Sequence, residues 1–100
     1  MNNAIKHHTD KGYNIYTIPT NNRGNIFNVS LMVRPDNTEE VIIRKVTNNP
    51  YGTVGKSFKS FDDAMSNYKA AEFKASILLA ADSIMNYRVN AELARLAANN

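Results

Sequence analysis

The sequence predicts an α+β fold, in which an antiparallel sheet of three or four strands is followed by C-terminal helices packed on one face of the sheet. The main observation is a change of hydrophobic period near Ser60: apolar residues alternate before it and recur every three or four residues after it. A chain of 100 residues has the size of one domain. We therefore expect a single domain, 1–100, with a flexible N-terminus over 1–11, the sheet over 12–59 and helices over 60–98.

The first two strands have different signals. Residues 13–18 are rich in β-branched and aromatic side chains and stop before Pro19, which favours a strand that ends there. Residues 27–34 show the clearest alternation, with four apolar side chains on one face: Phe27, Val29, Leu31 and Val33. Asparagine and glycine at 21–25 supply a turn between the two strands, because both residue types tolerate positive φ.

A third strand follows at residues 41–46, after a turn at Pro35, Asp36 and Asn37. Residues 57–59 are long enough for a short fourth strand. Consecutive strands joined by short turns favour an antiparallel meander.

The helical region begins with a capping pattern. Ser60 is followed three residues later by Asp63, so the serine hydroxyl can accept a first-turn N–H group and the helix begins at Phe61. A single helix over residues 61–98 would be about 55 Å long at 1.5 Å per residue, which exceeds the width of a domain of this size. We expect breaks near residues 70–73 and near residues 86–90, where helix propensity is weakest.

Composition excludes several classes of function. The chain has no cysteine, which excludes disulfides, zinc-thiolate sites and thiol nucleophiles. The first ten residues lack the apolar core of a signal peptide, and the longest apolar-rich run, 75–81, is far shorter than the ~20 residues that span a bilayer. We expect a soluble cytoplasmic protein that does not bind membranes.

No motif indicates catalysis, a cofactor or a metal. The segment 52–57 ends in Gly-Lys-Ser as a phosphate-binding loop does, but Pro50 occupies the position of the first glycine of that loop. His7, His8 and Asp10 carry metal-ligating groups on a polar terminus that we expect to be disordered. We therefore expect a non-enzymatic protein with no catalytic, cofactor-binding or metal-binding residues.

Four basic residues and one tyrosine make a candidate nucleic-acid surface. A strand leading into a loop can gather their phosphate-binding and base-stacking groups, which belong to Arg44, Lys45, Tyr51, Lys56 and Lys59. The net charge of +3 is compatible with this function, but it is equally compatible with a solvated strand edge whose charges discourage edge pairing.

Part of this region resembles the WGR domain of some DNA-damage proteins. In that domain an aromatic residue and two glycines end a strand, and a Phe-x-Ser element then leads into an acidic helix start. Residues 51–69 follow the same order, with Tyr51 in place of the tryptophan and Thr53 in place of the arginine. The resemblance implies nucleic-acid contacts from this segment.

The overall plan resembles small phage-encoded anti-defence proteins, anti-CRISPR proteins included, in size and architecture. This resemblance implies a protein encoded by a phage or mobile element that docks on and inhibits a host protein or nucleoprotein complex. The best candidate contacts outside the basic loop are Leu93 and Leu96, which lie three residues apart on a helix beyond the expected core. The alternatives are a nucleic-acid-binding module, a segment 91–100 that folds back on the sheet, and a homodimer paired through Phe73, Ile77 and Ile84.

Overall fold

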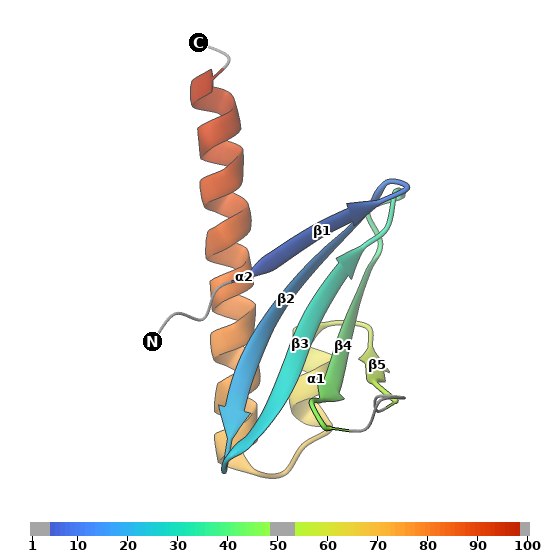
Figure 1. The fold of residues 1–100 in the computed structure, drawn as a ribbon, viewed down its shortest axis with the longest axis vertical. Helices are drawn as coiled ribbons and strands as arrows, with labels where there is room; N and C mark the ends of the chain where they lie inside the picture. The colour runs from blue at the N-terminus through green and yellow to red at the C-terminus, as the bar shows by residue number, and fades with distance from the viewer. Residues whose placement is uncertain (1–4, 49–53, 99–100) are drawn as a thin grey trace.

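The computed structural model describes residues 5–48 and 54–98 and shows one antiparallel sheet followed by two helices (Figure 1). The strands are β1 (Lys6–Asp10), β2 (Tyr13–Asn22), β3 (Asn25–Val33), β4 (Glu39–Lys45) and β5 (Lys56–Phe58), and each pairs with the next one in the chain. The helices are α1 (Phe61–Ser66) and α2 (Ala71–Ala98). The predicted α+β class and the antiparallel meander are both confirmed.

Strand β1 replaces part of the flexible N-terminus that the sequence predicts. Residues 6–10 pair with β2 in a register that joins Lys6 to Thr17 and Asp10 to Tyr13. The two residues between the strands, Lys11 and Gly12, have φ angles of 51° and 85°. This is the turn geometry that lets a two-residue loop follow the natural twist of a hairpin, and it brings the polar N-terminal segment into the sheet.

The other turns lie where the sequence predicts them. Arg23 and Gly24 connect β2 to β3 with φ angles of 54° and 81°, which makes a second tight two-residue turn. Between β3 and β4, the Asp36 carboxylate accepts hydrogen bonds from the backbone N–H of Thr38 at 3.0 Å and from its hydroxyl at 2.7 Å. These bonds lower the pKa of Asp36.

The hydrophobic core lies between one face of the sheet and the two helices. The strands contribute alternate residues, and Tyr16, Leu31, Val41 and Phe58 form one row across β2, β3, β4 and β5. The helices contribute five buried side chains, which are Ala64, Phe73, Ile77, Ala80 and Ile84. Eleven buried residues form this single core layer. In the described part of the chain both helices pack on this face of the sheet, and neither covers the opposite face.

The helical region begins as predicted and first breaks close to the expected position. Ser60 is extended, and its hydroxyl accepts the backbone N–H of Asp63 at 3.0 Å. Residues 67–70 separate α1 from α2, so the first break occurs a few residues before the expected 70–73, and Phe73 is already helical.

The second expected break, at residues 86–90, does not occur, because α2 runs without interruption to Ala98. Adding a residue to a helix that already exists costs far less than starting one, so the weak propensity of Asn86 and Asn90 does not stop α2. The predicted homodimer contacts Phe73, Ile77 and Ile84 are buried against the chain's own sheet.

We predict that Leu31→Ala lowers the free energy of unfolding by about 2 to 5 kcal/mol, because it leaves a cavity in the centre of the core. Leu31 is only 3% exposed. The adjacent Met32 points to the opposite face of the sheet, so Met32→Ala is the matched control and should cost clearly less. Equal losses in urea denaturation would contradict the observed strand register.

We also predict that Ser60→Ala destabilises the protein by about 1 kcal/mol, because a first-turn N–H group loses its acceptor. Ser60→Gly should cost only a few tenths of that amount, since glycine leaves room for water to reach the same group. Thermal melts of the two variants measure the difference. If neither variant changes stability, the cap does not contribute to helix formation.

Candidate docking surface on the projecting end of α2

Helix α2 has an anchored part and a projecting end. Its four buried side chains all lie before residue 85, whereas every residue from 89 to 98 is exposed. We call residues 89–98 the projecting end. Figure 1 shows this part of the helix extending past the N-terminal end of β1, with no other element around its far tip.

The change from anchored to projecting follows from the residue types on one helix face. The core-facing positions are occupied by Phe73, Ile77, Ala80 and Ile84, and the same face continues with Tyr87, Ala91, Ala94 and Ala98. Small side chains have little apolar surface to bury, so nothing draws the last three turns onto the sheet. The alanines still favour helix, and the helix therefore continues without tertiary support.

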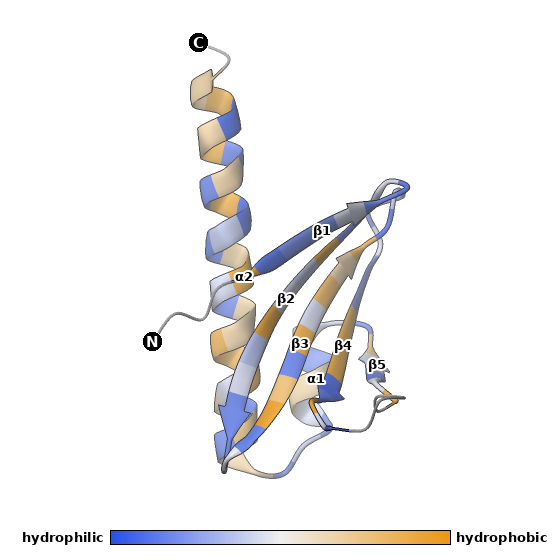
Figure 2. Cartoon of the chain, in the orientation of Figure 1, coloured by the Kyte–Doolittle hydropathy of each residue, from blue (hydrophilic) through white to orange (hydrophobic). Residues whose placement is uncertain are grey.

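An apolar stripe runs along the projecting end and its approach. It is formed by Met85, Val89, Leu93 and Leu96, which are 57%, 47%, 59% and 48% exposed. With 3.6 residues per turn, these four positions span an arc of about 80° on the helix surface. In Figure 2 apolar and hydrophilic positions alternate along this half of α2, and the helical period places the four large apolar positions on one side of the helix. We call these four residues the α2 stripe.

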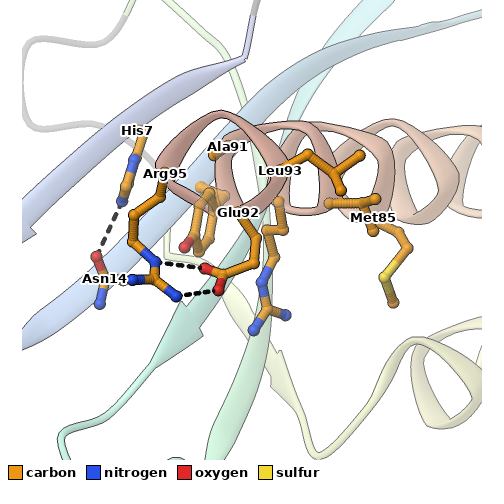
Figure 3. Close-up of a pocket in the computed structure, with 10 residues that line it drawn as sticks. His7, Asn14, Met85, Ala91, Glu92, Leu93 and Arg95 are labelled. Atoms are coloured by element: carbon orange, nitrogen blue, oxygen red, sulfur yellow. Dashed lines mark hydrogen bonds and ion pairs between the residues drawn. The ribbon is translucent and has the colours of Figure 1, made fainter. Parts of the chain in front are cut away.

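One ion pair lies beside the stripe. Arg95 donates from Nε to Glu92 Oε2 at 3.1 Å and from Nη2 to Oε1 at 2.5 Å (Figure 3). The hydrogen bond from Arg95 lowers the pKa of Glu92, and the same bond raises the pKa of Arg95. The two charges cancel, so the projecting end carries apolar surface without net charge among its described residues.

A groove separates the projecting end from the sheet. It has a volume of about 840 Å³, and its sheet side is formed by His7, Asn14 and Tyr16. Its helix side is formed by residues of α2 between Met85 and Arg95. In Figure 3 the His7 ring points toward Asn14, and a dashed line marks their hydrogen bond.

Stacked rings fix the angle at which α2 leaves the sheet. The His7 and Tyr16 rings are stacked with centroids 4.4 Å apart, and Tyr87 meets both edge-on at 5.7 Å and 5.9 Å. Arg88 lies 5.4 Å from the centroid of the Tyr16 ring and also approaches Glu39 at 3.5 Å. These contacts hold the last anchored turn of α2 against β1, β2 and β4.

The hydrogen bonds of His7 agree with one tautomer of its ring. His7 Nε2 lies 2.9 Å from Asn14 Oδ1, and His7 Nδ1 lies 3.4 Å from the Tyr87 hydroxyl. A proton on Nε2 donates to the amide oxygen, which leaves Nδ1 to accept from Tyr87. His7 is therefore an ordered part of the groove, not a residue of a disordered terminus.

His7, His8 and Asp10 do not converge on a metal. His7 points to the helix side of the sheet, whereas His8 and Asp10 point to the opposite face because side chains alternate along β1. Within residues 5–48 and 54–98, no group of three histidine or acidic side chains has the arrangement of a metal site.

The four basic residues of the predicted nucleic-acid surface lie near β4 and β5 but on different faces. Arg44 lies on the open face, where its guanidinium packs beside Gly55, whereas Lys45 and Lys56 lie on the helix side. The Lys56 ammonium is 5.8 Å from the centroid of the Tyr68 ring, and burial raises the pKa of that tyrosine.

Lys59 lies at a third position, beyond the end of β5, where its backbone N–H donates to the Asp63 carboxylate at 3.3 Å. Tyr51, the predicted stacking residue, and the first part of the segment that resembles the WGR domain lie outside the described residues. The described basic side chains are thus divided among separate surfaces.

The two predicted docking leucines, by contrast, lie on one surface. Leu93 and Leu96 belong to the α2 stripe, and the described residues 91–98 do not fold back on the sheet. Sequence reasoning missed the sheet side of the groove, because it took residues 1–11 as disordered. The position of Gly12, between a polar segment and the first predicted strand, was the available signal for a hairpin.

Neither helix is long and apolar enough to cross a lipid bilayer, as far as the described residues show. Comparisons of the chain with protein-family models, with curated proteins and with solved structures find no match.

Proposed function

We propose that this chain is a non-enzymatic binding protein of a phage or other mobile element, which docks on a host protein or nucleoprotein complex and inhibits it. The observation that carries the proposal is the α2 stripe, four large apolar side chains held in the open on an ordered helix. Contiguous exposed apolar surface on a small domain is typical of an interaction site.

The chemistry of the stripe indicates the kind of surface that it fits. An amphipathic helix that presents apolar residues at intervals of three and four positions is the form that binds in an apolar groove of a larger protein. Two ordered leucines lie next to a Glu92–Arg95 pair without net charge. This arrangement favours a partner groove whose floor is apolar and whose rim is polar. A nucleic-acid backbone would instead require a concentration of positive charge, which the projecting end lacks.

Inhibition by such a helix needs no catalytic group. A helix that occupies a partner's groove excludes whatever that groove normally binds, and the rest of the domain adds steric bulk beside it. The anchored part of α2 packs on the sheet and continues into the projecting end without a linker, so the rest of the domain is held beside the docked helix.

We predict that replacing both Leu93 and Leu96 with serine abolishes partner capture while the fold is unchanged. Both side chains are about half exposed, so their loss should change the free energy of unfolding by no more than about 0.5 kcal/mol each. Affinity capture with tagged protein, followed by binding measurements on the captured partner, compares the variant with the parent chain.

The control for this experiment is Leu79→Ser. Leu79 is 67% exposed on the same helix but lies outside the α2 stripe. Leu79→Ser removes one exposed leucine, as each half of the double variant does, and it should leave capture unchanged. If Leu79→Ser and the double variant weaken capture equally, the stripe is not the docking surface.

We further predict that a chain ending at Asn90 keeps a melting temperature close to that of the full chain, because residues 91–98 contribute no buried side chain. Circular dichroism should show a loss of helix signal without a loss of cooperativity. Aggregation or unfolding of the shortened chain would instead show that the projecting end supports the core.

A further inference from the structure

Strand β1 has one side without a partner in the described part of the chain. It lies at the end of the strand order, so only its β2 side is paired, and all five of its side chains are exposed. It is polar throughout, as its blue colour in Figure 2 shows. An edge strand of this kind presents backbone N–H and C=O groups to any strand that can reach it.

The turn before β2 determines which backbone groups point outward. A two-residue turn makes Asp10 and Tyr13 the closing pair of the hairpin, and backbone groups along an antiparallel ladder then alternate between the two sides. The N–H and C=O groups of His7 and Thr9 consequently face away from β2. A neighbouring antiparallel strand must align its own outward-facing residues with these two.

The charges of β1 are complementary to those of a second, antiparallel copy of the same strand. If the two-fold axis passes beside His8, His7 lies opposite the partner's Thr9, which satisfies the backbone alignment. In the same register Lys6 lies opposite the partner's Asp10, and Asp10 lies opposite the partner's Lys6. Opposite charges placed directly across two strands stabilise the pair, whereas like charges destabilise it.

Other arrangements lose this complementarity. A parallel pair in the same alignment would place Lys6 beside the partner's Lys6 and Asp10 beside the partner's Asp10. An antiparallel pair centred on His7 would place Lys6 opposite the partner's His8 and would leave Asp10 without an opposite charge within β1. Only the His8-centred register forms both ion pairs.

We propose that the chain forms a homodimer through β1, in the antiparallel register centred on His8, so that two five-stranded sheets join into one of ten strands. The two-fold axis is then perpendicular to the sheet, and both α2 helices lie on the same face. The partner's Thr9 would lie beside His7 on the groove side, where a small side chain fits next to the stacked rings.

A charge-exchange experiment tests this register. The parent chain should sediment at a mass near twice its 11.2 kDa, with concentration-dependent dissociation. Lys6→Asp and Asp10→Lys each place like charges across the two-fold axis, so each variant alone should sediment as a monomer. An equimolar mixture of the two variants should recover the dimer mass, because every cross-strand pair then has opposite charges.

The double variant, Lys6→Asp with Asp10→Lys, restores both pairs within one chain and should dimerise like the parent. Both substituted positions, Lys6 and Asp10, are exposed, and circular dichroism melts verify that each variant folds. A parent chain that stays monomeric at millimolar concentration would overturn the proposal and would assign the edge charges a protective role against pairing. Single variants that dimerise as the parent does, or a mixture that stays monomeric, would overturn the proposed register.

Discussion

The fold depends on one interface, the burial of a single apolar stripe of α2 on one face of the sheet. Phe73, Ile77, Ala80 and Ile84 recur at intervals of three and four residues, and they meet alternate side chains of β2, β3 and β4. A sheet of this curvature with one covered face has no second layer to compensate for a lost contact. The aromatic contacts lie at the two ends of this interface.

These two ends are built differently. Near the start of α2, Phe73 stacks on Tyr68 with ring centroids 4.4 Å apart and meets Phe27 edge-on at 4.8 Å, which closes the core. Near residue 87, the rings of His7, Tyr16 and Tyr87 stand at the border of the groove, where one side of the cluster is open to solvent. The core is therefore sealed at one end and continues into an open groove at the other.

Much of the fold could be predicted from the sequence, because its signals are local. Each of these signals depends only on residues close by in the sequence. They are the alternation in β3, the turn at Arg23 and Gly24, and the cap at Ser60. The path of α2 could not be predicted in the same way. Asn86 and Asn90 weaken helix propensity locally, but whether a helix continues through them depends on the stability of the part that packs on the sheet.

The candidate site likewise has one part that the sequence could predict and one part that it could not. The sequence placed Leu93 and Leu96 beyond the expected core, and it left open whether their segment folds back on the sheet. The groove could not be predicted, because His7 reaches it only through a hairpin that pairs polar residues, and the hydrophobic period carries no information about such a strand. Arg44 and Lys45 lie on opposite faces of the sheet, and the sequence could not assign each to its face without the strand register.

The unsupported final turns of α2 also set the depth and width of the recess that the protein can enter. Ten residues at 1.5 Å each extend about 15 Å, and a helix with its side chains is about 10 Å across. The sheet is wider than a single helix, so it cannot enter the same recess. A partner cavity that is one helix wide and roughly three turns deep would therefore admit the tip of this molecule and stop its body at the rim.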